Sequence, residues 1–226
     1  KNRAFIQYGV GDLFDVPEKT ILAWISEKKM PSYRIKNQYY FNKAEINEWI
    51  LKNDIAVSEK ILDLALTNRP VSLLELIRTG DVHYDIGGTT VREVIDEVVD
   101  TIPIPKSTDR DTVRASLLQR EEMMSTAVGK GMALPHPRNP IISDLDDESV
   151  SVCFLKNQVD YGALDGEPVW ALFIIISSNA KRHLEILSKI SFLCKQDDFM
   201  KTLRERPKKK VFLNYIEQVE KEWNGR

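Results

Sequence analysis

The chain has 226 residues, and its 32 Lys and Arg against 34 Asp and Glu give a formal charge of −2, which excludes the overall positive field of a protein that coats nucleic acid. Its 42% hydrophobic and 29% charged residues are typical of a globular protein and exclude disordered, fibrous and collagen-like classes. The length predicts two domains of modest size.

Three features predict a cytoplasmic protein with no membrane insertion. The two cysteines, Cys153 and Cys194, are too few for a disulfide scaffold and lack zinc-finger spacing, so we expect reduced core residues. The longest apolar run, residues 169–176, falls far short of the roughly 20 residues that span a bilayer. Residues 1–10 lack the apolar stretch of a secretory signal.

The N-terminal part begins with two short helices. A first helix is expected over residues 8–14. Pro17 suits the first position of a second helix, where its missing N–H costs nothing. The buried face of this second helix is predicted from helical spacing to carry Ile21, Trp24 and Ile25.

After Pro31 the pattern changes to period two. Residues 33–35 and 39–41 predict a β-hairpin, with Asn37 in its turn. Asn42, followed three residues later by Glu45, predicts the start of a third helix. The apolar face of that helix carries Ile46, Trp49 and Ile50.

This order of elements, with the stretches 16–25, 30–35 and 41–49, resembles the excisionase and MerR-like winged helix-turn-helix family. The resemblance implies that the second helix enters a DNA major groove and that the hairpin acts as the wing. The candidate DNA contacts are basic: Lys19, Lys28, Lys29, Arg34 and Lys36. Because Leu22 and Ala23 cannot hydrogen-bond to base edges, a protein-interaction module stays open as the alternative.

Residues 54–69 form a connector between this domain, residues 1–53, and a second one, residues 70–226. Leucines, isoleucines and charges predict a helix over about 58–66 in place of a flexible linker. Such a helix would act either as a spacer or as the seam of a homodimer, and both interpretations stay open.

From residue 71 onward, helical and strand patterns mix as in an α/β domain. Ser72 and Thr90, each followed three residues later by Glu, predict helix starts, and Gly80 predicts the end of the first helix. Residues 150–155 and 169–176 predict strands, the second at the centre of a sheet. Two closing helices are expected, one lined by Leu184, Leu187, Ile190 and Cys194 and one by Val211, Tyr215, Ile216, Val219 and Trp223.

His136 stands between two prolines, which place it on stiff, extended backbone. Gly129 and Gly131 upstream permit a tight turn. Taken alone, such a histidine favours a structural role.

The surrounding motifs change that interpretation. They are Arg120-Glu121, Ser125-Thr126, Gly129-x-Gly131 and Ala133-Leu134-Pro135-His136. In this order they resemble the enzyme IIA domains of the phosphoenolpyruvate-dependent phosphotransferase system, of the mannitol, fructose and nitrogen-regulatory type, over about residues 71–223. The resemblance implies a mixed sheet flanked by helices and a phosphoryl group carried on His136. Pro137 departs from the glycine common in the family.

The resemblance further implies a second active-site histidine, matched by His183, and phosphate stabilisation by Arg120. A helix start near His183 would favour a phosphate and a neutral imidazole. Arg138 is either an assisting or a solvated residue, and His83 is expected to be structural. No cofactor or metal is implied, since His136 and His183 lack metal-ligand spacing, and no hydrolase nucleophile elbow is present.

Together these features predict a cytoplasmic regulator in which a phosphocarrier domain, rather than a metabolic enzyme, is fused to a DNA-binding module. Its phosphoryl donor would be a histidine phosphocarrier protein. Two alternatives stay open: an interaction scaffold that is never phosphorylated, and a soluble enzyme IIA component of sugar transport.

Overall fold

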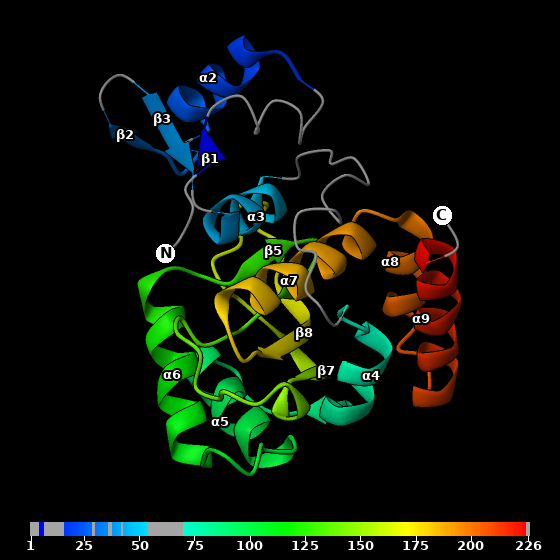
Figure 1. The fold of residues 1–226 in the computed structure, drawn as a ribbon. Coiled ribbons are helices and arrows are strands. Elements are labelled where there is room, and N and C mark those ends of the chain that lie inside the picture. The colour runs from blue at the N-terminus through cyan, green and yellow to red at the C-terminus, as the bar shows by residue number, and fades with distance from the viewer. Residues whose placement is uncertain are drawn as a thin grey trace.

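The computed structural model describes residues 5–6, 16–28, 30–35, 38–41, 43–53 and 70–224. The helices predicted for residues 8–14 and 58–66 and the predicted cap Asn42 lie outside this part of the chain. The described residues form an N-terminal unit and a larger C-terminal unit (Figure 1).

The N-terminal unit contains the predicted second helix, hairpin and third helix. Its elements are β1 (Phe5–Ile6), α2 (Glu18–Glu27), β2 (Tyr33–Ile35), β3 (Gln38–Phe41) and α3 (Lys43–Lys52). Pro17 is the N-cap of α2, one position earlier than predicted. The hairpin is antiparallel, with Tyr33 opposite Tyr40, and β1 adds a third strand alongside β3 that the sequence pattern did not predict.

A small apolar core holds this unit together. Its buried members come from both helices, the loop between α2 and β2, and β3: Ile21, Met30, Phe41, Ile46, Trp49 and Ile50. The rings of Trp24 and Trp49 lie 5.5 Å apart between centroids, and Nε1 of Trp49 donates to the carbonyl oxygen of Lys28 at 2.8 Å. The end of α2 is thereby fixed to α3, the helix that follows the hairpin.

The C-terminal unit mixes helices and strands. Its elements are α4 (Leu73–Gly80), β4 (Val82–Ile86), α5 (Val91–Thr101), α6 (Arg110–Met123), β5 (Ala127–Gly129), β6 (Met132–Ala133), η2 (Leu145–Asp147), β7 (Ser149–Val159), β8 (Val169–Ile176), α7 (Ala180–Cys194), α8 (Asp197–Arg204) and α9 (Lys209–Asn224).

A five-stranded mixed sheet in the order β4-β7-β8-β6-β5 organises this unit. The pairs β4–β7 and β6–β8 are parallel, whereas β7–β8 and β5–β6 are antiparallel. Every residue of β8 is buried, which confirms the prediction of a central strand.

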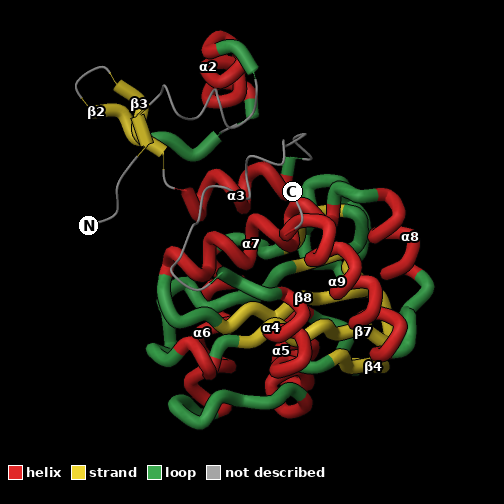
Figure 2. The backbone as a smooth tube through the Cα atoms, turned by 45° about the vertical axis from the view of Figure 1, so that its right-hand side comes forward, coloured by secondary structure: helices red, strands yellow, loops and turns green. Residues whose placement is uncertain are grey.

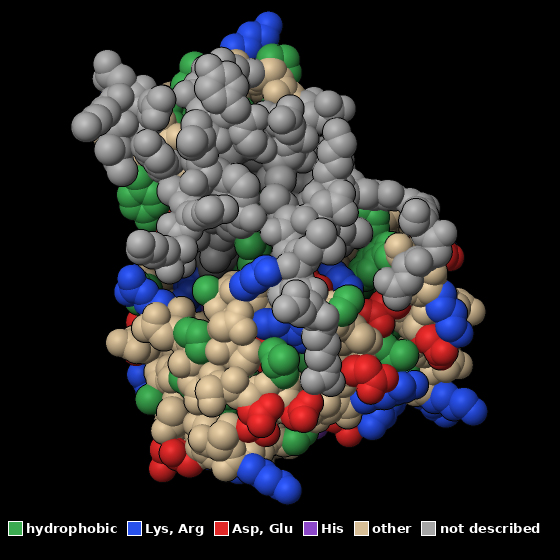
Figure 3. All heavy atoms as spheres, viewed as in Figure 1, with side chains coloured by type: hydrophobic (Ala, Val, Ile, Leu, Met, Phe, Trp, Pro, Cys, Tyr) green, Lys and Arg blue, Asp and Glu red, His purple; other side chains and the backbone are tan. Residues whose placement is uncertain are grey.

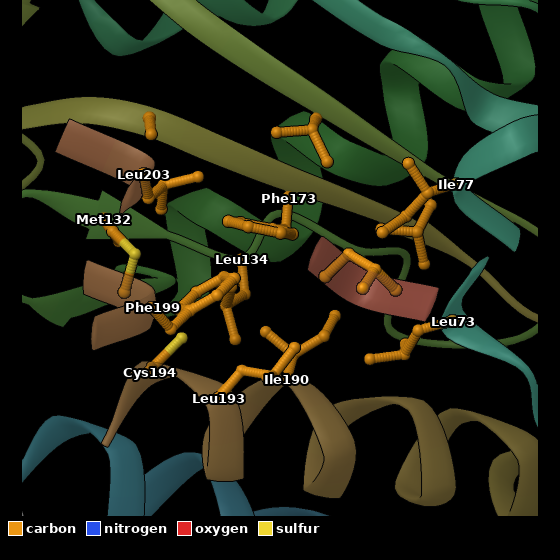
Figure 4. Close-up of a cluster of buried hydrophobic side chains, with 14 of the residues drawn as sticks. Leu73, Ile77, Met132, Leu134, Phe173, Ile190, Leu193, Cys194, Phe199 and Leu203 are labelled. Atoms are coloured by element: carbon orange, nitrogen blue, oxygen red, sulfur yellow. The ribbon is translucent and has the colours of Figure 1, made fainter. Parts of the chain in front are cut away.

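Alternate residues of β8 enter two different cores, because successive side chains of a strand point to opposite faces. Phe173 and Ile175 join a cluster with α4, α7, α8 and α9. Figure 4 shows Phe173 among side chains from those elements, Leu73, Ile190 and Phe199 included. Leu172 and Ile174 join a second cluster with α5 and α6. The sheet is therefore covered on both faces.

Local signals fixed several helix ends. The hydroxyl oxygens of Ser72 and Thr90 accept hydrogen bonds from the backbone N–H groups of Glu75 and Glu93, as predicted. The sequence pattern missed α8, and it wrongly placed Val211 on a buried face: this side chain, in the first turn of α9, is 55% exposed. Cys153 and Cys194 are free and buried, as expected.

The surface in Figure 3 shows Lys and Arg interspersed with Asp and Glu over the described C-terminal unit, so this face has no field of a single sign. None of the helices in the described ranges combines the length and the apolar character needed to cross a membrane. Helix α3 of the N-terminal unit packs against α7 and β5 of the C-terminal unit, and both ribbon views place α3 beside α7 (Figures 1 and 2).

Candidate active site around His136

The backbone that carries His136 is fixed on two sides. Residues 134–136 directly follow β6 and belong to neither a helix nor a strand. The Leu134 N–H donates to the carbonyl oxygen of Thr126 at 3.0 Å, and the Ile175 N–H donates to that of Pro135 at 3.0 Å. These two bonds hold the backbone on both sides of Pro135, and the central strand β8 provides one of them.

The hydrogen bonds of the His136 ring define its tautomer. Its Nδ1 lies 2.7 Å from the carbonyl oxygen of Leu134, which can only accept, so Nδ1 carries the proton. The Nε–H of Arg120 donates to Nε2 at 3.2 Å. The ring is only 3% exposed. A neutral imidazole in this setting directs the lone pair of Nε2 toward the guanidinium.

The last turn of α6 positions Arg120. Its side chain is buried, and its Nη1 donates to the carbonyl oxygen of Met124 at 2.6 Å. The neighbouring Glu121 accepts from the backbone N–H of Thr126 at 2.8 Å and from its hydroxyl. The bonds between Glu121 and Thr126 thus join the Arg-Glu pair to the Ser-Thr pair and hold the turn between α6 and β5.

His183 lies in the first turn of α7 and meets His136. The ring centroids are 4.6 Å apart and the planes are inclined by 46°. Two N–H groups at this helix start already have a partner, because Oδ1 of Asn179 accepts from those of Lys181 and Arg182. The partial positive charge of the helix start remains as its favourable contribution to an anion.

The glycine pair upstream of His136 forms the tight turn between β5 and β6. Gly129 and Gly131 have φ of 85° and 77°, and Lys130 between them has φ of 54°. The carboxylate of Asp165 accepts the Lys130 N–H at 2.7 Å. This left-handed turn needs glycine, because side chains disfavour such φ values.

The arrangement combines a nucleophile with groups that stabilise an anion. Nε2 of His136 holds the lone pair, Arg120 supplies a positive fork, and the start of α7 adds a partial positive charge. Within the described ranges, no three His, Cys, Asp or Glu side chains are grouped to hold a metal ion.

Other predicted residues lie elsewhere. Arg138 is exposed, and its Nη1 contacts Sδ of Met123 at 3.4 Å. The Nε2 atom of His83 lies 2.9 Å from the carbonyl oxygen of Gly80. The candidate DNA contacts Lys19, Lys28 and Arg34 are exposed in the N-terminal unit, whereas Lys29 and Lys36 lie outside the described residues.

The sequence interpretation missed Glu148. Its carboxylate is buried next to the start of α7 and binds Arg182, the residue before His183. These two charges are far apart in the sequence, and no motif links them. The sole hint was a carboxylate directly before a strand of apolar residues.

Comparison with known proteins accounts for both units. Residues 75–219 match the family described as phosphoenolpyruvate-dependent sugar phosphotransferase system, EIIA 2, and residues 10–54 match a helix-turn-helix domain. These matches confirm the two resemblances noted in the sequence.

Individual relatives agree with the family match. A nitrogen regulatory protein of Pseudomonas aeruginosa is 27% identical over 66% of this chain and 97% of its own length. The fructose-specific EIIABC component of Bacillus subtilis is 29% identical over 67% of this chain, but the chain covers only 24% of that longer protein. The crystal structure of the nitrogen regulatory protein IIA-Ntr from Neisseria meningitidis shares the fold, with a TM-score of 0.53 and 23% identity over 63% of this chain and 94% of that one.

Proposed function

The chain belongs to the type 2 EIIA family of the phosphoenolpyruvate-dependent sugar phosphotransferase system, and on this premise we propose that it carries a phosphoryl group on Nε2 of His136. The donor is a histidine phosphocarrier protein, and the exchange takes place in the cytoplasm. The observation that carries this proposal is the tautomer of His136, whose Nδ1 proton is held by Leu134 and whose Nε2 faces Arg120.

In the proposed step the lone pair of Nε2 forms a bond to phosphorus. The N–P bond of the donor phosphohistidine breaks, and its electron pair returns to the donor nitrogen. Arg120 moves its N–H groups from Nε2 to the phosphoryl oxygens, which suit its forked geometry. Because phosphoryl transfer needs little covalent chemistry from the protein, positioning and charge neutralisation by Arg120 and His183 provide most of the rate.

The helix-turn-helix unit makes DNA the proposed target of regulation. Lys19, Lys28 and Arg34 supply exposed positive charge. Helix α3 contacts α7, the helix that carries His183, so a phosphoryl group at the active site can affect the N-terminal unit through this contact. A phosphoryl group adds about −1.5 to −2 charge, and we propose that this charge changes the contact and, through it, the affinity for DNA.

A second proximity, between the wing and the loop after His136, supports the coupling. The hydroxyl of Tyr33 donates to both carboxylate oxygens of Glu45, at 2.8 and 2.9 Å, and this bond raises the pKa of Tyr33. The positive charge of Arg138, two residues beyond His136, acts on the same pKa in the opposite direction. The loop after His136 therefore lies near the wing.

Two apolar side chains of the N-terminal unit favour a second candidate, which is binding of a protein instead of DNA. Leu22 is 40% exposed on α2 and Tyr33 is 52% exposed on the wing, and Leu22 offers no hydrogen bond to a base edge. Under this candidate the phosphoryl group regulates the binding of a partner protein, and this chain binds no DNA at physiological salt.

The test is incubation with phosphoenolpyruvate, enzyme I and a histidine phosphocarrier protein, followed by intact mass measurement of wild type and His136→Ala. One acid-labile phosphate on wild type that is absent from the variant supports the proposal. No adduct with any phosphocarrier protein refutes it and favours the scaffold. DNA binding by wild type, with and without phosphate, then tests the coupling, which equal affinities would exclude.

A further inference from the structure

Glu148 forms a buried cluster of hydrogen bonds directly before β7. Its Oε2 accepts from Nε and Nη2 of Arg182 at 2.8 and 2.7 Å. Its Oε1 accepts from the backbone N–H and the hydroxyl of Ser178, at 3.0 and 2.7 Å. The Glu148 side chain is 0% exposed and that of Arg182 is 7% exposed.

These two partners flank the start of α7. Ser178 precedes the N-cap Asn179, and Arg182 precedes His183 along the chain. One carboxylate therefore fixes the backbone on both sides of the first helical turn. The N–H of His183 donates to the carbonyl oxygen of Asn179 at 2.9 Å, so the backbone position of His183 depends on this turn.

A buried ion pair of this kind is a weak source of stability. Its desolvation cost offsets its attraction, and a well-packed apolar pair of similar volume is often as stable. What the ion pair adds is geometry, because a guanidinium bound through two nitrogens to one carboxylate oxygen has little rotational freedom.

We propose that Glu148 is a positioning residue that, through Arg182 and Ser178, holds the ring of His183 against that of His136. The proposal rests on the proposed function for its consequence in phosphoryl transfer. Its geometric part, the orientation of His183, exists in the unphosphorylated protein.

The supports of the two histidines are separate, and this makes the proposal specific. His136 is fixed through Pro135 and Leu134 to β8 and to the turn before β5, and neither bond involves Glu148. Loss of the Glu148 cluster should therefore displace His183 and leave the His136 backbone in place. We expect slower transfer at saturating donor, with a nearly unchanged KM for the donor.

The main variant is the double substitution Glu148→Leu and Arg182→Met, which removes both charges together and keeps an apolar volume. The single variant Glu148→Gln keeps the shape but removes the negative charge of Glu148 from beside Arg182. Glu220→Gln is the matched control, because the buried carboxylate of Glu220 likewise accepts from a serine hydroxyl, that of Ser72, and from a backbone N–H at a helix start, that of Leu73.

The primary measurement is the ring ¹H–¹⁵N and ¹H–¹³C spectrum of both histidines in each unphosphorylated, folded variant. We expect the His183 signals of the double variant to shift and its ring contacts with His136 to weaken, with the His136 tautomer retained. We expect the rate at saturating donor to fall about 10- to 100-fold, because small misplacements of reacting groups lower rates by such factors. The Glu220→Gln control should show neither change.

A folded double variant with wild-type His183 signals overturns the proposal, whatever its transfer rate. Shifted His183 signals with an unchanged transfer rate overturn the catalytic consequence. If wild type accepts no phosphate at all, the proposed function fails, and the His183 spectrum still decides whether Glu148 positions this ring. If the double variant does not fold, Glu148→Gln supplies the same comparison.

Discussion

The Nε–H of Arg120 donates to Nε2 of His136 across 3.2 Å, so the guanidinium lies beside the atom proposed to receive the phosphoryl group. The Nη1 of the same side chain is anchored to the carbonyl oxygen of Met124. Arg120 is therefore held beside the ring before any donor binds, and a short movement of its N–H groups from Nε2 brings them to the phosphoryl oxygens.

The substitution Arg120→Lys should slow phosphoryl transfer by about 10²-fold, the usual effect of losing one oriented donor. Lysine keeps the charge but lacks the fork, so the rate at saturating donor should fall while the KM for the donor changes little. Rapid-quench measurement of phosphate uptake checks this. Arg92→Lys is the control, because Arg92 forms an exposed pair with Glu122. Equal rates for Arg120→Lys and Arg92→Lys would contradict the role of the guanidinium.

The substitution Gly131→Ala should destabilise the C-terminal unit by about 2 to 5 kcal/mol, the sum of left-handed strain and overpacking. The added Cβ would lie 2.0 Å from Nε1 of Trp170, a buried ring beside β6. Gly162→Ala is the matched comparison, since its φ of 67° is similar and nothing lies within 4 Å of the added Cβ. Its cost should be about 1 kcal/mol. Urea unfolding measures both values, and equal costs would exclude the Trp170 contact as the cause.

Both thiols should resist modification in the native protein. Burial raises the pKa of Cys194 to about 12 and raises that of Cys153 as well, so neither forms the reactive thiolate near neutral pH. Titration with a thiol-specific chromogenic disulfide should detect no reactive group until guanidinium unfolds the chain, after which both cysteines react. Rapid reaction of either thiol in the folded protein would show that its surroundings open.

The double variant Lys28→Ala, Arg34→Ala should weaken DNA binding in a way that depends on salt but not on sequence. Each lost phosphate contact lowers the slope of log affinity against log salt concentration by about 1. Fluorescence anisotropy at several salt concentrations measures this slope. Lys221→Ala, an exposed charge on α9, is the control. An unchanged slope in the double variant would favour protein binding by the N-terminal unit.

Features with a local cause were predictable from the sequence. The capping residues Ser72 and Thr90 act on the N–H three residues ahead, and the apolar run 169–176 could only be covered on both faces. These features could be predicted from the spacing of residues along the chain.

Other features depend on tertiary contacts and were not predictable in this way. The sequence pattern alone does not bring His183 to His136, and the resemblance to the EIIA family supplied that pair. The Glu148–Arg182 pair joins the start of β7 to the start of α7, which only the packed sheet brings together. Helix α8 is short, so its sequence pattern does not show which face is buried. The packed core shows that Phe199 and Leu203 lie on that face. Val211 fits the apolar period of α9, but its side chain in the first turn is 55% exposed.

The position of the phosphate on the His136 ring decides whether Nε2 is the phosphoryl acceptor. Wild-type protein labelled with ¹⁵N-histidine and phosphorylated by the carrier protein would be examined by long-range ¹H–¹⁵N and by ³¹P spectroscopy. The account predicts a single phosphohistidine at His136, with phosphorus coupled to Nε2 and the proton still on Nδ1. A phosphoryl group on Nδ1, or on any residue other than His136, would contradict it.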